Sequence, residues 1–137
     1  MLSVPMTNRD SIEELRKKFI VDEGQYVADR LQDDVEKLLR YCKISKQGRV
    51  LITKRELTDK KKVGLVVFAR YIGNKLDNAI SELVIADEIA TYTGIEKASV
   101  NARGKELVDD GFLSRPEAAT YKVNPSKIQD FVDLLEA

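Results

Sequence analysis

The chain has 137 residues, of which 43% are hydrophobic and 34% are charged. This length suffices for one compact domain or one small domain with an extension, and this composition excludes a disordered chain. Lys and Arg total 23, as do Asp and Glu, so the net charge is zero and the overall basic excess of many DNA-binding domains is absent.

Two amphipathic helices are expected in the N-terminal part of the chain. Asp10 or Ser11 can cap the first helix, and Gly24 is expected to break it. The apolar side of this first helix consists of Ile12, Leu15, Phe19 and Ile20. A second helix is expected over about residues 25–41, with apolar residues at spacings of mostly three and four: Val27, Leu31, Val35, Leu38, Leu39 and Cys42. This stripe can pack on the chain's own core or on the same helix of a second copy.

A turn and a buried helix follow. Residues 46–49, KQGR, form a turn between apolar residues, which predicts a small hairpin or a single strand at Val50–Thr53. Thr58 can cap the next helix, and residues 63–80 are the most hydrophobic stretch of the chain. Because Arg70 and Lys75 interrupt this stretch, it indicates a central core helix and not a membrane span.

Residues 83–123 predict an extended piece at 83–85, a helix over 86–93, a turn at Gly94, a helix over 96–110 and two strands at 112–115 and 120–123. A last helix is expected to begin at residues 124–126. The fold is therefore expected to be mainly α with a small β-hairpin. Gly104 falls on the inward stripe of the helix over 96–110, which predicts that a neighbour such as Tyr71 or Phe68 packs very close to it.

The motifs of this region resemble the winged helix-turn-helix family of bacterial and archaeal transcriptional regulators, over about residues 60–125. The resemblance lies in Glu88-Ile89-Ala90, Thr93-Gly94-Ile95, Ser99-Val100, residues 107–113 (LVDDGFL) and Tyr121-Lys122-Val123. It implies a winged helix-turn-helix domain with a small β-wing and a C-terminal helix at residues 58–137, preceded by an N-terminal helical extension with a small basic hairpin at residues 1–57. It also implies that double-stranded DNA is the partner, and that residues 97–109 form the recognition helix.

The resemblance implies ten DNA-binding residues. On the recognition helix, Asn101 suits adenine and Arg103 suits guanine in the major groove. Phosphate contacts are expected from Lys97, Ser99 and Lys105 on that helix, from Arg115 and Lys122 on the wing, and from Lys60, Lys61 and Lys62 in the basic run over residues 43–62. The alternative for each charged residue is a solvated surface group.

The charge distribution leaves a second function open. Residues 1–79 hold 17 basic and 12 acidic residues, whereas residues 80–137 hold 6 basic and 11 acidic residues. An acidic DNA-reading half counts against DNA, because phosphate contacts supply most non-specific affinity. The leading hypothesis is a dimeric, sequence-specific DNA-binding regulator, with a homodimer built from the N-terminal helices and the C-terminal helix. The alternative is a winged-helix adaptor for a protein partner, without DNA binding.

Other classes of function find little basis in the sequence. The single cysteine, Cys42, excludes an intramolecular disulfide, and the lack of histidine excludes the usual zinc sites. Neither a phosphate-binding glycine loop nor a nucleophile beside a base is present, so we expect neither an enzyme nor a cofactor. The first residues, MLSVPMTNRD, are too short an apolar run for a signal peptide, and we expect a cytoplasmic protein that is not bound to a membrane.

Overall fold

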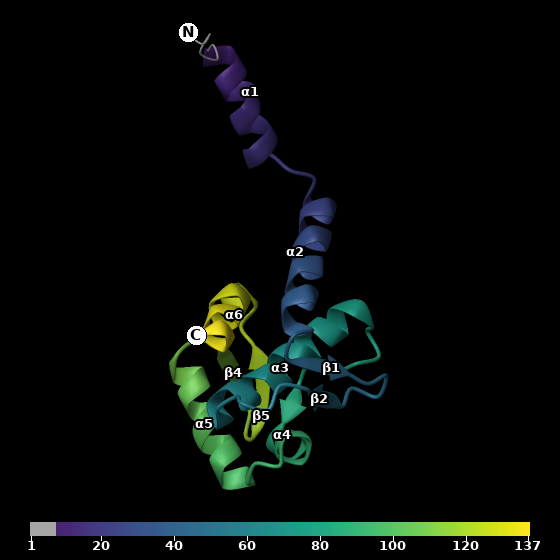
Figure 1. Ribbon diagram of the computed structural model, residues 1–137, viewed down its shortest axis with the longest axis vertical. Coiled ribbons are helices and arrows are strands. Elements are labelled where there is room, and N and C mark those ends of the chain that lie inside the picture. Colours follow the sequence, from purple (N-terminus) through teal and green to yellow (C-terminus); the bar gives the residue numbers. More distant parts are fainter. Residues whose placement is uncertain (1–7) are drawn as a thin grey trace. The chain divides into compact units, whose positions relative to one another are not determined.

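The computed structural model describes residues 8–137, with side chains from Ser11 onward. Within these residues it holds six α-helices and two small antiparallel sheets, which confirms the expected mainly α architecture (Figure 1). The chain divides into two compact units, and the boundary between Gln32 and Asp33 falls inside α2 (Glu23–Leu38). No helix in the described part of the chain is both long and apolar enough to cross a membrane.

In the first unit, α1 (Asn8–Phe19) begins earlier than expected, so Asp10 and Ser11 lie inside the helix and do not cap it. The predicted break at Gly24 is also wrong, since Gly24 lies in the first turn of α2. The break comes before Glu23 because Asp22 caps α2: its carboxylate accepts a 2.9 Å hydrogen bond from the backbone N–H of Gln25. A good cap therefore outweighs the low helix propensity of one glycine.

The core of the second unit surrounds α3 (Asp59–Leu76), which Figure 1 shows running through its middle. Thr58 caps this helix as expected, with its side chain accepting from the N–H of Lys61 at 3.3 Å. Phe68 of α3 stacks on Phe131 of α6 (Ile128–Glu136), with ring centroids 4.2 Å apart. The apolar stripe of α6 is thus buried inside the chain and is not free to pair with a second copy, contrary to the expected dimer interface.

The expected small hairpin is present as β1 (Cys42–Ile44) and β2 (Val50–Ile52), which pair antiparallel. The apolar spacing predicts Cys42 as the last residue of the stripe on the second helix. This prediction is wrong, because α2 ends at Leu38 and Cys42 belongs to β1. The reason is a long-range pairing that periodicity does not reveal: the carbonyl of Tyr41 accepts from the N–H groups of Thr53 and Lys54. Burial raises the pKa of the Cys42 thiol to about 12, so it behaves as a small apolar side chain.

A second sheet has the order β3–β5–β4 and consists of β3 (Val84–Ile85), β5 (Thr120–Val123) and β4 (Leu113–Glu117). Between β3 and β4 the chain forms α4 (Ala86–Thr93) and α5 (Lys97–Asp109), and Gly94 ends α4 at φ 75°, as predicted. The β4–β5 turn is tighter than predicted, because Pro116 and Glu117 belong to β4. A short 3-10 turn, Pro125–Lys127, leads into α6.

Candidate nucleic-acid interface

The inward side of α5 packs unusually close to β5. Val100 and Leu107 are fully buried, and between them a Cβ atom on Gly104 would lie only 2.6 Å from Cζ of Tyr121. The predicted close approach at Gly104 is therefore confirmed, but its partner is Tyr121 and not Tyr71 or Phe68. Only a glycine lets the ring and the helix backbone meet at this distance.

Asn101, the predicted adenine reader, also contacts Tyr121. The tyrosine hydroxyl donates a 3.0 Å hydrogen bond to Oδ1 of Asn101. Burial raises the pKa of Tyr121, an effect that the nearby Arg115 reduces, so the hydroxyl keeps its proton at neutral pH. Asn101 thus has a structural role, and the carboxamide oxygen that would accept from a base already has one donor.

Most of the cationic side chains around α5 that were predicted to contact DNA form an ion pair with an acidic residue or lie over the ring of Tyr121. Lys97 pairs with Asp87 at 3.0 Å, Arg103 with Glu106 at 3.1 Å and Lys122 with Glu82 at 3.6 Å. The guanidinium of Arg115 lies 5.9 Å from the ring centroid of Tyr121. Lys105 is exposed and Ser99 is half-buried. Each of these ion pairs is at least partly exposed to solvent, where such a pair is worth at most about 1 kcal/mol, so a phosphate can compete for the cation.

The three consecutive lysines that were expected to act together point to different places. Lys60 pairs with Asp110 at 2.7 Å, and Nζ of Lys61 donates to the carbonyl of Ala137 at 3.0 Å. Lys62 instead lines a hollow beside α4. The helix is the cause, because successive residues are rotated by about 100° around its axis. A basic run in the sequence is therefore not a basic patch in the structure.

That hollow, which we call the basic hollow, has a volume of about 280 Å³. Three cationic side chains line it: Lys54 and Arg55 from the segment before α3, and Lys62 from the first turn of α3. Tyr92 and Thr93 of α4 line its other side. Its lining residues are Ile52, Lys54, Arg55, Lys62, Tyr92 and Thr93. None of the six is acidic. Lys62 was among the ten DNA-binding residues predicted from the sequence, and Lys54 and Arg55 belong to the same basic run over residues 43–62.

Arg70, a buried residue of α3, fixes the segments around the basic hollow. Its guanidinium donates to the carbonyls of Ser81 at 2.7 Å, Gly48 at 3.2 Å and Leu83 at 3.2 Å, and to the carboxylate of Glu88 at 3.0 Å. One side chain thus joins the hairpin turn, the loop before β3 and α4. The sequence carried a signal for it, since a charge inside the most hydrophobic stretch must find acceptors when it is buried.

Glu88 extends this network to the surface of α4. Its carboxylate accepts from Arg70, from the backbone N–H of Ile85 at 3.2 Å and from the hydroxyl of Tyr92 at 3.1 Å. Burial alone would raise the pKa of Glu88, but these hydrogen bonds and the charge of Arg70 outweigh it, and the pKa is lowered. Tyr92 is thereby held in place at the edge of the basic hollow, with the guanidinium of Arg49 lying 5.9 Å from its ring centroid.

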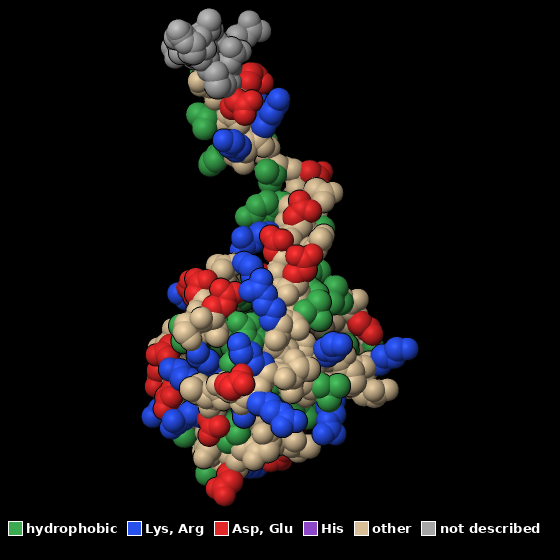
Figure 2. All heavy atoms as spheres, viewed as in Figure 1, with side chains coloured by type: hydrophobic (Ala, Val, Ile, Leu, Met, Phe, Trp, Pro, Cys, Tyr) green, Lys and Arg blue, Asp and Glu red, His purple; other side chains and the backbone are tan. Residues whose placement is uncertain are grey.

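On the face of the second unit that Figure 2 shows, Lys and Arg side chains are interspersed with Asp and Glu side chains. In the described residues no group of three or more His, Cys, Asp and Glu side chains could hold a metal ion. Comparisons of the chain with protein-family models, with curated proteins and with solved structures give no match.

Proposed function

We propose that the second unit contains a winged helix-turn-helix and binds double-stranded DNA, with α5 as the recognition helix. The observation that carries this proposal is the order α3–β3–α4–α5–β4–β5 together with the sheet order β3–β5–β4. In this arrangement α4 and α5 form the helix-turn-helix and the β4–β5 hairpin is the wing. The left-handed Gly94 at the turn and the Gly104–Tyr121 contact fit α5 tightly between α3 and the wing.

The outward side of α5 has the small and cationic residues that a major-groove helix needs. Ala98 and Ala102 are exposed and let the helix approach base edges closely, and Lys97 and Lys105 are exposed beside them. Arg103 can reach a guanine once it leaves Glu106, a half-buried partner on the same helix. Nε of Arg103 has no hydrogen-bond partner among the described residues, so reorienting this side chain sacrifices little.

A second candidate function is a protein-binding adaptor on the same fold. It is favoured by the acidic partners of Lys97, Arg103 and Lys122 and by the acidic balance of residues 80–137. If these pairs persist, the surface around α5 offers little net positive charge to phosphate.

A mobility-shift titration with random-sequence duplex at two salt concentrations separates the two functions. A DNA-binding protein should shift the duplex at low salt and lose affinity by orders of magnitude between about 50 and 200 mM salt, because counterions are released on binding. If no shift appears at either concentration, the DNA-binding function is rejected in favour of the adaptor.

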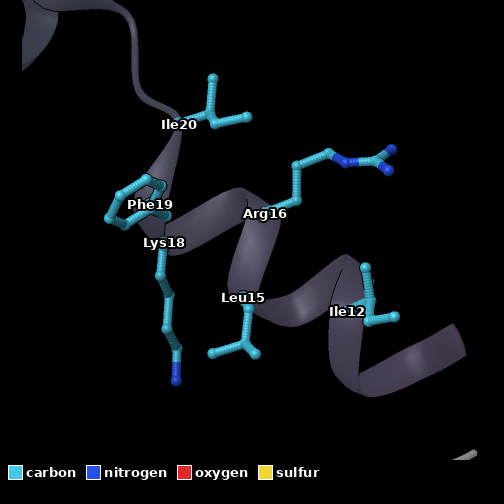
Figure 3. Close-up of a pocket in the computed structure, with 6 residues that line it drawn as sticks. All are labelled: Ile12, Leu15, Arg16, Lys18, Phe19 and Ile20. Atoms are coloured by element: carbon cyan, nitrogen blue, oxygen red, sulfur yellow. The ribbon is translucent and has the colours of Figure 1, made fainter. Parts of the chain in front are cut away.

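We further propose that the protein acts as a homodimer that pairs through α1. One side of this helix is apolar and exposed, and Figure 3 shows the side chains of Ile12, Leu15 and Phe19 on α1 and of Ile20 directly after it. Phe19 is 88% exposed and Leu15 is 62% exposed. An apolar stripe of this kind is more stable when a second helix covers it.

Charge complementarity indicates that the covering helix is α1 of a second copy. Glu13 and Glu14 lie in the first half of α1, and Arg16, Lys17 and Lys18 lie in its last turn. An antiparallel pair related by a two-fold axis places the acids of each copy beside the bases of the other. The same two-fold symmetry suits a regulator that reads two half-sites on DNA.

A further inference from the structure

The basic hollow has a charge pattern that differs from the rest of the surface around α5. The guanidinium of Arg55 and the ammonium of Lys62 make no ion pair or side-chain hydrogen bond with the side chains described, from Ser11 onward, and the hollow has no acidic lining residue. By contrast, Lys97, Arg103 and Lys122 each have an acidic partner. Cations held together without counter-charge repel one another, and an anion in the hollow would relieve that repulsion.

A fourth cation lies beside the hollow, because the guanidinium of Arg49 is 5.9 Å from the ring centroid of the lining residue Tyr92. Lys54, which lines the hollow, has its ammonium 5.4 Å from the ring centroid of Tyr41. Arg70 fixes the turn that carries Arg49 by donating to the carbonyl of Gly48, and Glu88 fixes Tyr92. The hollow is therefore built by a defined network and not by mobile surface side chains alone.

The ligand that fits this chemistry is a phosphate group. An arginine supplies a planar fork of donors and a lysine supplies a compact charge, and both are established phosphate ligands in proteins. The hydroxyl of Thr93 takes no part, because it already donates to the carbonyl of Ile89 at 2.7 Å.

The position of the hollow along the chain links it to α5. Thr93 lines the hollow, and Lys97 begins α5 four residues later, so their Cα atoms lie at most about 14 Å apart. The major groove is about 12 Å wide. When the N-terminus of α5 lies in the groove, this distance leaves the hollow within reach of the sugar-phosphate backbone at the groove's edge.

We propose that the basic hollow binds a backbone phosphate of the duplex that α5 reads, with Arg55 and Lys62 as its ligands. This inference rests on the proposed DNA-binding function. A free phosphate compound carries the same chemical group as the DNA backbone and would fit the same ligands. It differs from the sequence-based expectation, because Lys60 and Lys61 take no part in it.

The test compares two double variants that remove the same charge. Arg55→Gln/Lys62→Gln removes both ligands, and Lys60→Gln/Lys61→Gln is the matched control on the neighbouring residues. Duplex affinity is measured by fluorescence anisotropy over a range of salt concentrations, and circular dichroism verifies that both variants are folded. The ligand variant should lower the slope of log affinity against log salt by about 1 to 2, equally for specific and random duplexes, and the control should leave it unchanged. An unchanged slope in the ligand variant, or an equal change in the control, overturns the proposal.

A second measurement separates failure of the hollow from failure of the DNA-binding function. Inorganic phosphate is titrated into ¹⁵N-labelled protein, and the amide signals of residues 52–55, 62, 92 and 93 are followed. Saturable shifts in the wild type that vanish in Arg55→Gln/Lys62→Gln support the anion site. If they occur in a protein that binds no duplex, the DNA-binding function is overturned and the hollow is assigned to a free phosphate compound. If the protein binds duplex, but the double variant leaves the salt slope unchanged and phosphate leaves the amide signals unchanged, only the proposed phosphate site is overturned.

Discussion

The hydroxyl of Tyr121 in β5 donates a 3.0 Å hydrogen bond to Oδ1 of Asn101 in α5. One helical turn further on, the ring of the same tyrosine fills the space where Gly104 lacks a side chain. Tyr121 is fully buried, so a single residue of β5 sets both the distance and the register between the β4–β5 hairpin and α5. A helix held in this way presents its outward residues at a fixed angle to any surface that it meets.

Gly104→Ala should destabilise the protein, although alanine usually favours a helix by about 0.5–1 kcal/mol over glycine. The new Cβ would lie 2.6 Å from Tyr121, and overpacking of this kind costs about 1–3 kcal/mol. Urea denaturation measures the change. Lys105→Ala, an exposed substitution next to it, is the control and should stay within about 0.5 kcal/mol of the wild type. A more stable Gly104→Ala variant would show that the ring can move away.

Arg103→Ala should reduce affinity for a specific DNA site by about 1–3 kcal/mol and relax base preference at one position, which is the usual effect of losing a bidentate contact. Glu106→Ala is the informative companion. It releases Arg103 from its 3.1 Å ion pair and should raise affinity for all duplexes. Equal losses on specific and random DNA would exclude base reading by Arg103. If neither DNA is affected, α5 is not the recognition helix.

Arg70→Met should destabilise the second unit by about 3 kcal/mol, since it leaves Glu88 and three carbonyls without their shared donor. Arg70→Lys should recover little of this loss, because one ammonium group cannot reach the hairpin turn, the loop before β3 and α4 together. Chemical denaturation of both variants is the measurement. Full stability in the lysine variant would show that charge alone matters at this position.

The stability of the protein should decrease in acid partly through Glu88. Burial raises its pKa, but the bonds from Arg70 and from the backbone of Ile85 outweigh burial, so its folded pKa lies below the ordinary value of 4.5. The stabilisation is therefore complete above the unfolded pKa and is lost as the pH falls through the folded value. Melting temperatures of the wild type and Glu88→Gln, measured from neutral pH down to about pH 3, should converge toward the acid end. Parallel curves would contradict this assignment.

Reversing the charges of α1 tests the antiparallel dimer. Glu13→Lys/Glu14→Lys leaves Asp10 as the one acidic residue of the helix, and Arg16→Glu/Lys17→Glu/Lys18→Glu leaves Arg9 as its one basic residue. Each variant alone should be monomeric by light scattering, because like charges meet in both halves of the pair. An equimolar mixture should regain the mass of a dimer. If the wild type is itself a monomer at micromolar concentration, the dimer is excluded.

Elements with local signals could be predicted closely from the sequence. The bounds of α4 and the left-handed Gly94 follow from a short apolar strand, a helical period and a glycine within ten residues. The end of α2 and the position of Cys42 could not be predicted, because the backbone pairing of Tyr41 with Thr53 is set by distant residues. The apolar residues keep a helical spacing as far as Cys42, although the backbone is no longer helical after Leu38 and β1 begins at Cys42.

The candidate site was harder to predict than the fold. Lys60, Lys61 and Lys62 are adjacent in the sequence but diverge around α3, and Lys62 joins Tyr92 thirty residues away. Periodicity indicates which face of a helix a residue occupies, but not which loop lies opposite that face. Gly104 shows the same limit: its spacing predicted close packing correctly, and only the structure identifies Tyr121 as the neighbour.

The four hydrogen-bond acceptors of Arg70 also have a consequence for motion. Three of them lie in loop segments, namely the hairpin turn at Gly48 and the loop at Ser81 and Leu83, and the fourth lies on α4. None of these segments can swing away without breaking bonds that the others share, so their opening events are linked. In amide hydrogen exchange, the β1–β2 hairpin and α4 would then lose protection together, as one cooperative unit.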